Sequence, residues 1–212
     1  MQRWSDAIYD YIRDNSRFDD PLLRKMEARA QHDGFPIIGP LVGPWLYLFA
    51  RLTGAKRIFE LGSGFGYSTW YFASALRDNG GGEVVHTVWD AELSQEAQIW
   101  LERASLLSCC DFQVSESILA LESAKPGIDI IFMDIDKEGY PDALPVIERK
   151  LRPGGLLLTD NVLWDGLVID QANTDIATKC IRELNTYLAN SEKWDYMINP
   201  LRDGLGVARL RD

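Results

Sequence analysis

The chain has 212 residues, of which 46% are hydrophobic and 11% aromatic, and its formal net charge at pH 7 is -10. This size and composition suit one substantial buried core, so we expect a single domain over residues 1–212. The negative charge argues against a broad basic surface for nucleic-acid phosphates, because binding to that polyanion depends on Lys and Arg, although it leaves room for a local basic pocket. No stretch approaches the length of a membrane span and the N-terminus has no apolar signal segment, so we expect a cytoplasmic protein.

The N-terminal part of the chain, residues 4–53, has the pattern of two or three helices. Gly39-Pro40 and Gly43-Pro44 start or break one of them, and Gly54 suits the end of the last. We expect these helices to form a cap, residues 1–54, on a core that spans residues 55–212, rather than a separate domain.

Strand and helix patterns alternate from about residue 57 onward, which is typical of a parallel sheet flanked by helices. The apolar run IDIIFMDI suits a central strand that is buried on both faces. The predicted strands span residues 57–61, 83–89, 111–116, 128–135, 155–160, 194–199 and 206–210. The predicted helices span residues 67–78, 92–106, 141–151 and 175–189. A turn at residues 200–204 joins the last two strands into a hairpin-like close of the sheet.

A glycine-rich turn follows the first strand and opens a helix, with the sequence Glu60-Leu61-Gly62-Ser63-Gly64-Phe65-Gly66. In a parallel sheet this is the turn where the backbone approaches a ligand. Tyr67 stands where a dinucleotide GxGxxG motif has its third glycine, which disfavours NAD or FAD. Glu60 suits a cationic ligand group, such as an amino-acid ammonium, better than a pyrophosphate, which it would repel. A tight turn without any ligand is the competing interpretation.

The end of the second strand is where an acid meets the ribose hydroxyls of an adenosine cofactor. Asp90 is the candidate at this position, and it could equally be the N-cap of the following helix. Trp89 beside it lies either against the adenine or in the core.

A second group of polar residues follows two later strands: Asp134, Asp136 and Lys137 in IIFMDIDKEGY, then Asp160 and Asn161 in LLLTDNVLWDG. Carboxylate and amide oxygens favour Mg²⁺, Mn²⁺ or Ca²⁺ over zinc. A bound divalent ion acts as a Lewis acid on a coordinated hydroxyl. Lys137 could take up the proton if the ion and partial burial lower its pKa from about 10.4. In the alternative interpretation the acids cap helices, Asn161 supports a turn and Lys137 is solvated.

The remaining candidates for chemistry are weaker. Cys109, Cys110 and Cys180 suit small core residues better than metal ligands or a disulfide framework. His32 and His86 are too far apart in sequence to indicate a histidine metal site or a Ser/His/Asp triad.

Taken together, these segments resemble the cation-dependent class I O-methyltransferases, the family of catechol O-methyltransferase and caffeoyl-CoA O-methyltransferase, and most of all its small bacterial members. The resemblance runs from about Ile37 to the C-terminus and rests on RLTGAKRIFELGSGFGYSTW, IIFMDIDKEGYPDAL, LRPGGLLLTDNVLWDG and NPLRDGLGVARL. The glycine segment is shared with other S-adenosylmethionine enzymes, whereas the DxDK and DN segments are specific to the family. The resemblance implies an α/β Rossmann-like fold with a mostly parallel seven-stranded sheet, helices on both faces and an antiparallel C-terminal strand.

The resemblance also implies a role for each site residue. S-adenosylmethionine would lie over Gly62, Ser63 and Gly64, with Glu60 near its amino group, Ser68 near its carboxylate, Asp90 or a neighbour at the ribose, and Ile38, Ser117 and Asp134 close by. Asp134, Asp160 and Asn161 would hold the metal, most simply Mg²⁺, and Lys137 would be the base. Two positions depart from the family pattern: Val88 stands where the ribose acid is usual, and Ser115-Glu116-Ser117 replaces a glycine and an acid.

The leading hypothesis is an O-methyltransferase that acts on a small vicinal-diol aromatic, such as a catechol, a caffeoyl compound or a flavonoid. Leu163, Trp164 and residues 165–167 form either a substrate lid or ordinary loop packing. One alternative within the family is a tRNA hydroxyuridine O-methyltransferase, which the cluster of Arg149, Lys150 and Arg152 keeps open. Alternatives from other classes are a nicotinamide-dependent dehydrogenase and a non-catalytic cofactor-binding module.

The resemblance suggests a homodimer as well, with the N-terminal helices near the acceptor site. The aromatic residues Trp4, Tyr9, Tyr11 and Phe18 serve either that interface or the core.

Overall fold

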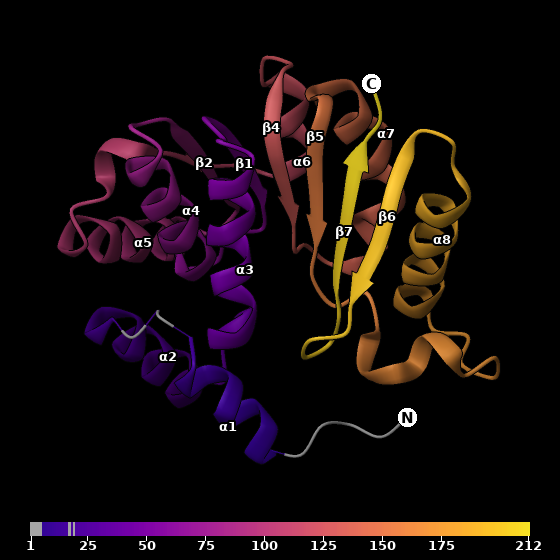
Figure 1. Cartoon of the computed structure of the whole chain (residues 1–212), viewed down its shortest axis with the longest axis horizontal. Coiled ribbons are helices and arrows are strands. Elements are labelled where there is room, and N and C mark those ends of the chain that lie inside the picture. Colours follow the sequence, from indigo (N-terminus) through magenta and orange to yellow (C-terminus); the bar gives the residue numbers. More distant parts are fainter. Residues whose placement is uncertain (1–5, 17, 19) are drawn as a thin grey trace.

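A seven-stranded sheet lies at the centre of the structure (Figure 1). This computed structural model describes residues 6–16, 18 and 20–212. The strands are β1 (Arg57–Leu61), β2 (Glu83–Val88), β3 (Cys110–Val114), β4 (Ile128–Met133), β5 (Leu151–Thr159), β6 (Trp194–Asn199) and β7 (Leu205–Leu210). They lie in the order β3-β2-β1-β4-β5-β7-β6. Strands β1 to β5 pair in parallel and β7 pairs antiparallel with β5 and β6, so the predicted sheet with its antiparallel C-terminal strand is confirmed.

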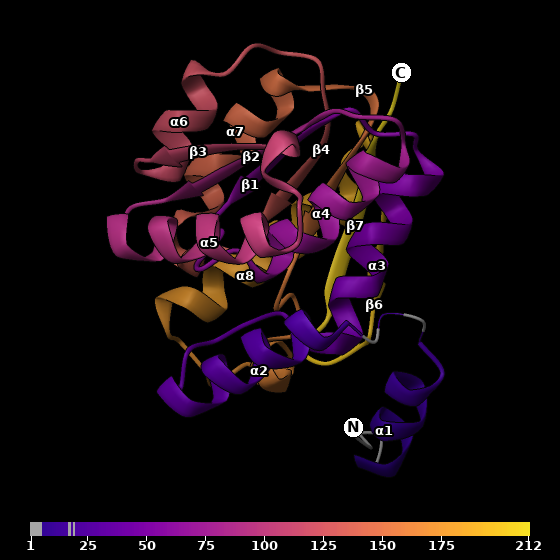
Figure 2. The same cartoon turned by 90° about the vertical axis from the view of Figure 1, so that its left-hand side faces the viewer.

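Helices cover both faces of the sheet. The α-helices are α1 (Asp6–Asp14), α2 (Pro21–Asp33), α3 (Gly39–Leu52), α4 (Tyr67–Asp78), α5 (Ala91–Arg103), α6 (Ser117–Ser123), α7 (Tyr140–Lys150) and α8 (Ile176–Asn190). Short 3₁₀ helices are η1 (Leu107–Cys109), η2 (Lys137–Gly139) and η3 (Trp164–Ile169). Figure 2 shows α4 and α5 on one side of the strands and α6 and α7 on the other. No helix in the described part of the chain is long and apolar enough to cross a membrane.

The two sides of strand β4 divide the hydrophobic core. Ile130 and Phe132 belong to a cluster with helices α2 to α5, whereas Ile131 and Met133 belong to a cluster with α6, α7 and α8. All four side chains are fully buried. Because successive side chains of a strand point to opposite faces, the uninterrupted apolar run buries the strand on both sides, as the sequence predicts.

The N-terminal helices pack on one face of this core. Leu23 and Met26 of α2 and Leu46 of α3 belong to the same buried cluster as residues of β1 and β4. Helix α3 starts with Gly39-Pro40 and continues through Pro44, so the second Gly-Pro pair does not break it. Pro44 lies one turn into the helix, where it removes only the hydrogen bond to the carbonyl of residue 40. Trp4, one of the aromatic residues assigned to a possible interface, lies outside the described residues.

Strand β5 is the element whose start differs most from its sequence prediction. It begins at Leu151 rather than at residue 155, and it passes through Pro153-Gly154. The pairing with β4 shifts register between Ile128 and Ile130, which accommodates the extra residues. Proline is tolerated at such an irregular position because no ladder hydrogen bond is needed there.

The cysteines lie in packed surroundings rather than at a reactive surface. Cys109 and Cys180 are buried, Cys110 is partly buried, and all three are free. This placement agrees with the sequence interpretation of small core residues.

Gly43 makes a close helix contact that should respond to substitution. A Cβ atom at Gly43 would overlap the ring of the buried Tyr71 and lie 2.7 Å from its Cδ2. Gly→Ala normally stabilises a helix interior by about 1 kcal/mol. We expect Gly43→Ala instead to lower the free energy of unfolding by about 1–3 kcal/mol, because the added methyl overpacks the core. Urea unfolding measures this change.

A double-mutant cycle with Tyr71→Leu is the control for this prediction. Removing the ring should restore the ordinary helix preference, so that Gly43→Ala is neutral or stabilising in that background. An equal loss of stability in both backgrounds would show that the ring contact is not the cause.

Candidate active site

A cavity of about 1370 Å³ opens where the parallel strands end. Its lining comes from the segments after β1, β2, β4 and β5, from the β6–β7 turn, and from the N-terminal helices above them. In sheets of this kind, ligands bind outside the carboxyl ends of the strands at the point where the strand order reverses. Here β1 and β4 lie side by side although they are far apart in sequence, so the cavity occupies that position.

Strand register places two site residues next to each other. Leu61 pairs with Met133, and Met133 pairs with Thr159, at the ends of β1, β4 and β5. The ladder continues one step further, because the amide of Asp134 donates to the carbonyl of Leu61 at 2.9 Å and the amide of Asp160 donates to that of Met133 at 3.2 Å. Asp134 and Asp160 therefore lie side by side at the edge of the sheet.

The glycine turn lies against the same edge. Gly62 has φ +85°, and a Cβ atom there would lie 2.9 Å from the carbonyl carbon of Asp134 and overlap its oxygen. Gly64 also has a left-handed φ, and a Cβ atom there would lie 3.0 Å from a ring carbon of Phe35. Both positions need a left-handed φ and leave no room for a Cβ atom, and only glycine meets these two requirements. The backbone of this turn can therefore come close to the cavity. Gly62, Ser63, Gly64 and Ser68 all line the cavity.

Hydroxyl groups connect the glycine turn to its neighbours. Ser63 exchanges two hydrogen bonds with Thr87, whose backbone amide donates to Ser63 Oγ at 3.0 Å. The hydroxyl of Thr87 donates to the carbonyl of Glu60 at 2.6 Å and lies 2.9 Å from Ser117 Oγ. One buried side chain therefore joins β1, β2 and the start of α6, and it holds Ser117 at the cavity wall.

Glu60 lies behind the glycine turn rather than in the cavity wall. Its side chain is fully buried, and Thr69 Oγ1 donates to Oε2 at 2.5 Å. Oε1 has no hydrogen-bond partner among the described residues. Burial raises the pKa of Glu60 to about 7, against the lowering effect of the Ser68, Thr69 and Ser63 hydroxyls. His86 lies next in this chain of contacts, with Nδ1 3.1 Å from Thr69 Oγ1.

The residues at the end of β2 divide between two roles. Asp90 does not line the cavity; its Oδ1 accepts from the amides of Glu92 and Leu93 and caps α5. Trp89 does line the cavity and is 80% exposed, so the alternative that it fills the core is wrong. Glu116, which the sequence analysis did not assign to a ligand, also lines the cavity and caps α6 through Ile118 and Leu119. The ribose role of Asp90 stays a prediction.

Asp160 is the most unusual carboxylate of the site. It is 3% exposed, and its Oδ1 has no hydrogen-bond partner among the described residues. Oδ2 lies 3.9 Å from Nη1 of Arg202. Burial, and then repulsion from Asp134, raise the pKa of Asp160 to about 7. Two neighbouring acids, one of them buried with an oxygen that makes no hydrogen bond to the described residues, form a place that favours a bound cation.

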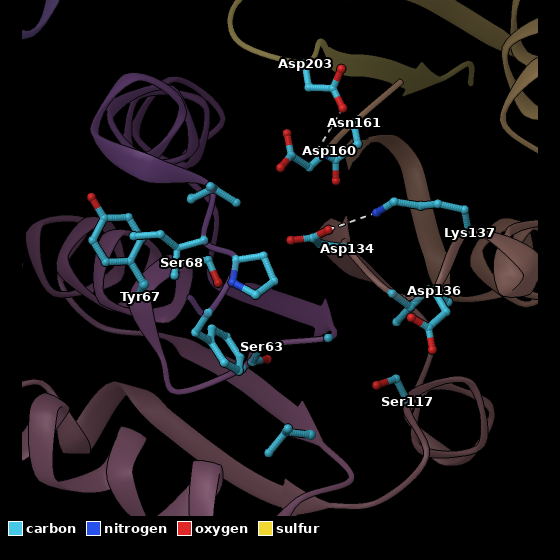
Figure 3. Close-up of a pocket in the computed structure, with 18 of the residues that line it drawn as sticks. Ser63, Tyr67, Ser68, Ser117, Asp134, Asp136, Lys137, Asp160, Asn161 and Asp203 are labelled. Carbon is cyan, nitrogen blue, oxygen red and sulfur yellow. Dashed lines mark hydrogen bonds and ion pairs between the residues drawn. The ribbon is translucent and has the colours of Figure 1, made fainter. Parts of the chain in front are cut away.

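Lys137 lies beside this pair. Its Nζ donates to Asp134 Oδ1 at 3.1 Å, and the residue is only 7% exposed (Figure 3). The rings of Tyr140 and Trp164 lie 5.1 and 5.9 Å from Nζ. The alternative of a solvated lysine is therefore wrong. Asp136 is exposed and points away from Asp160, towards the side of the cavity where Ser117 lies (Figure 3).

The β6–β7 turn contributes residues that the sequence analysis treated only as a hairpin turn. Arg202 donates to the carbonyl of Ile38 as well as lying near Asp160. Asp203 accepts from Nδ2 of Asn161 at 3.3 Å. The NPLRDG segment belongs to the family resemblance, but nothing in its pattern separates a turn from a wall of the cavity.

The N-terminal helices cover the glycine turn. Ile38, Phe35 and Tyr9 line the cavity from this side. The guanidinium of Arg29 lies 4.4 Å from the centroid of the Phe65 ring and makes a two-bond ion pair with Glu96 at 2.7 and 2.9 Å. Such a planar paired arginine is well suited to hold elements together. It joins α2 to α5 across the glycine turn.

The family follows from a comparison with known sequences. A family described as O-methyltransferase matches residues 14–211. The chain belongs to this family. A catechol O-methyltransferase from Niastella koreensis is 34% identical over 218 aligned residues, which cover 97% of each chain.

Solved structures agree with this O-methyltransferase assignment. An O-methyltransferase from Bacillus cereus in complex with SAH is 26% identical and has a TM-score of 0.86, with 97% of each chain covered. A methyltransferase from Geobacter sulfurreducens is 25% identical, has a TM-score of 0.82 and is covered over 98% of each chain. The protein is therefore an S-adenosylmethionine-dependent O-methyltransferase, and the dehydrogenase and non-catalytic alternatives are set aside.

The close approach of Gly62 to Asp134 predicts a loss of cofactor binding on substitution. Gly62→Ala should force the glycine turn and the Asp134 carbonyl apart, since neither backbone can yield without moving its strand. We expect the dissociation constant for S-adenosylhomocysteine, measured by calorimetry, to rise by about tenfold or more, which corresponds to about 1.4 kcal/mol. Gly81→Ala is the matched control, because Gly81 also has a left-handed φ but a Cβ atom there would meet no other atom within 4 Å. Equal losses in both variants would contradict this explanation.

The buried carboxyl of Glu60 predicts a pH dependence of stability. Its pKa rises from 4.5 to about 7 in the folded chain. Between these values the folded chain holds a proton that the unfolded chain has lost, so stability falls as pH rises through this window. Glu60→Gln should reduce the difference in unfolding free energy between pH 5 and pH 7. Asp160 still contributes a slope of the same sign in the variant, so the dependence becomes weaker without vanishing; an unchanged slope would refute the assignment to Glu60.

Proposed function

We propose that this O-methyltransferase depends on a divalent metal and transfers the methyl group to one hydroxyl of a small vicinal-diol aromatic. The observation that carries the proposal is Asp160, a buried carboxylate with an unpartnered oxygen beside Asp134 and next to Asn161 in the chain. A carboxylate in such a position is costly unless a cation offsets its charge.

The donor set suits a hard cation. Asp134, Asp160 and Asn161 offer oxygen atoms, as Mg²⁺ prefers, with Mn²⁺ or Ca²⁺ as alternatives. No group of three or more His, Cys, Asp or Glu side chains in the described part of the chain is placed to hold a metal alone. The amide of Asn161 would therefore be the third protein ligand, and open positions would remain for oxygen atoms of the acceptor.

The chain's own residues supply the rest of the reaction. A divalent ion held here would polarise the acceptor hydroxyl and favour loss of its proton. As a neutral amine, Lys137 is placed to receive that proton at Nζ, which lies beside Asp134 and is largely shielded from water. The wall formed by the glycine turn, Ile38 and Ser68 would hold S-adenosylmethionine with its methyl group towards this edge. Bringing two reactants together in a fixed orientation supplies much of the rate acceleration.

The two hydroxyls of a vicinal diol account for the choice of acceptor class. One oxygen can lose its proton to Lys137 while the other completes the contacts with the cation, so a lone hydroxyl would be held less well. Trp164 and Asp165 line this end of the cavity, whereas Leu163 and Leu167 do not. If this segment forms a substrate lid rather than ordinary loop packing, Trp164 and Asp165 are the residues that would contact the acceptor. The relative from Niastella koreensis is named a catechol O-methyltransferase, which supports the same class.

The charge of the cavity disfavours the tRNA alternative. Its basic lining residues are Lys137 and Arg202 among the described residues, and both lie near an acid of the site. The acidic lining residues are more numerous: Glu116, Asp134, Asp136, Glu138, Asp160, Asp165 and Asp203. A polyanion would be repelled by such a surface.

The basic cluster that kept the tRNA alternative open has other contacts. Arg149 pairs with Glu122, and Arg152 pairs with Asp129. Lys150 donates to the carbonyls of Glu122 and Ala124. Arg149 and Lys150 end helix α7 and Arg152 lies near the start of β5, at the end of the sheet opposite the cavity. The homodimer and the cytoplasmic location stay predictions.

Turnover measurements test the proposal. With a panel of catechol, caffeoyl and flavonoid acceptors, we expect S-adenosylhomocysteine production that EDTA abolishes and Mg²⁺ restores. Lys137→Ala should lower kcat by about 10²–10⁴-fold, the usual contribution of a positioned proton acceptor. Lys179→Ala, an exposed lysine on α8 away from the cavity, is the matched control and should leave kcat unchanged. Turnover that persists in EDTA, or that survives Lys137→Ala, would overturn the proposal.

A further inference from the structure

Asp203 joins the predicted metal ligand Asn161 to the loop that carries Trp164. Its Oδ2 accepts from Nδ2 of Asn161 at 3.3 Å, and its Oδ1 accepts from the backbone amide of Asp165 at 2.5 Å. Figure 3 shows Asp203 above Asn161, on the far side of it from Asp134. Asp203 thus lies in the cavity wall beyond Asn161 and contacts two parts of the site at once.

The hydrogen bond fixes the direction of the Asn161 amide. A carboxylate has acceptor atoms only, so the amide group must turn its NH₂ towards Asp203. The amide oxygen then points away from Asp203. This is the orientation that a hard cation requires, because the nitrogen of an amide is a donor and cannot ligate it. Outer contacts of this kind set the orientation of metal ligands in many proteins.

The loop after Asn161 needs support of its own. Asn161, Trp164 and Asp165 all have left-handed backbone conformations, with φ of 60°, 48° and 52°, and Gly166 follows at 84°. Such conformations are rare for residues other than glycine and persist where the surroundings hold them. The bond from the Asp165 amide to Asp203 holds this segment where the Trp164 ring reaches Lys137.

The turn that carries Asp203 is itself tightly fitted to this loop. Leu163 donates to the carbonyl of Asp203 at 2.8 Å, and Val162 donates to that of Gly204 at 3.1 Å. A Cβ atom at Gly204 would lie 2.5 Å from Leu163 Cγ. The position of Asp203 relative to Asn161 is therefore set by backbone contacts, not by its own side chain.

We propose that Asp203 is a positioning residue of this enzyme, which aims the Asn161 oxygen at the metal and holds the Trp164 loop over Lys137. The inference rests on the proposed function, since it assigns a second layer to the same metal site. It predicts that the hydrogen-bond polarity at residue 203, and not merely the shape of the side chain, determines metal affinity.

Asp203→Asn tests polarity at nearly constant shape. The new amide has one oxygen and one NH₂ group, so its NH₂ group must face another donor, either the Asn161 side chain or the Asp165 backbone amide. Where it faces Asn161, that residue can relieve the conflict only by turning its own nitrogen towards the cation. We expect the affinity for Mn²⁺, measured by electron paramagnetic resonance with S-adenosylhomocysteine and no acceptor, to fall by about 10–100-fold.

Exchanging the two residues provides the rescue. In the double variant Asn161→Asp/Asp203→Asn, the amide at residue 203 donates to the carboxylate at residue 161, whose other oxygen faces the cation. Aspartate tolerates the left-handed backbone of this position nearly as well as asparagine. Mn²⁺ affinity should return to within a few-fold of wild type, whereas Asn161→Asp alone, which opposes two carboxylates, should not bind as well as the double variant.

Two controls separate positioning from general damage. Asp170→Asn changes an exposed acid that accepts from the Ala172 amide in the same loop, and it should leave Mn²⁺ affinity unchanged. Binding of S-adenosylhomocysteine without metal should be equal in all variants. Wild-type affinity in Asp203→Asn, or a double variant no better than Asp203→Asn, would overturn the role of Asp203 while leaving the proposed function intact. A wild-type chain that takes up no Mn²⁺ would overturn both.

Discussion

Two carboxylates, those of Asp134 and Asp160, are brought side by side by the parallel register of β4 and β5, and Asp160 is buried there. Two negative charges at this distance repel each other, and the buried one also loses solvation. The positive side chains around them offset these costs. Lys137 lies against Asp134, and Arg202 lies near Asp160. Oδ1 of Asp160 has no hydrogen-bond partner among the described residues, and this is the oxygen that argues for a bound metal.

The edge that carries these acids is also linked to the glycine turn. Gly62 passes so close to the Asp134 carbonyl that the backbone of one site forms the wall of the other. Thr87 adds a second connection, since its hydroxyl and amide reach Glu60, Ser63 and Ser117. The glycine turn and the acidic edge are therefore in direct contact and are not independent parts of the sheet.

The sequence predicted the parts of this arrangement that depend on local pattern. Apolar runs placed the strands, and the end of each strand located Gly62, Asp134 and Asp160 at one edge, because parallel strands share their carboxyl ends. Side-chain direction was harder to foresee. Glu60 turns behind the glycine turn, although it stands where a cofactor ligand was expected. Asp90 caps a helix, which is one of the two roles that its position predicted. Residues that arrive from a distant turn, such as Asp203, carry no local signal of a role, because only the closing of the sheet brings them near Asn161.

Arg202 donates to the carbonyl of Ile38, which lies 164 positions earlier in the chain. The cavity is thus closed by segments from early and late in the sequence, while the ends of the strands between them form its floor. During synthesis the glycine turn and the acidic edge emerge long before the β6–β7 turn that completes the wall. Long-range contacts of this kind form late and slowly compared with local ones. In a nascent chain the glycine turn and the acidic edge can therefore be in place before β6 and β7 bring Arg202 and Asp203 to the cavity wall.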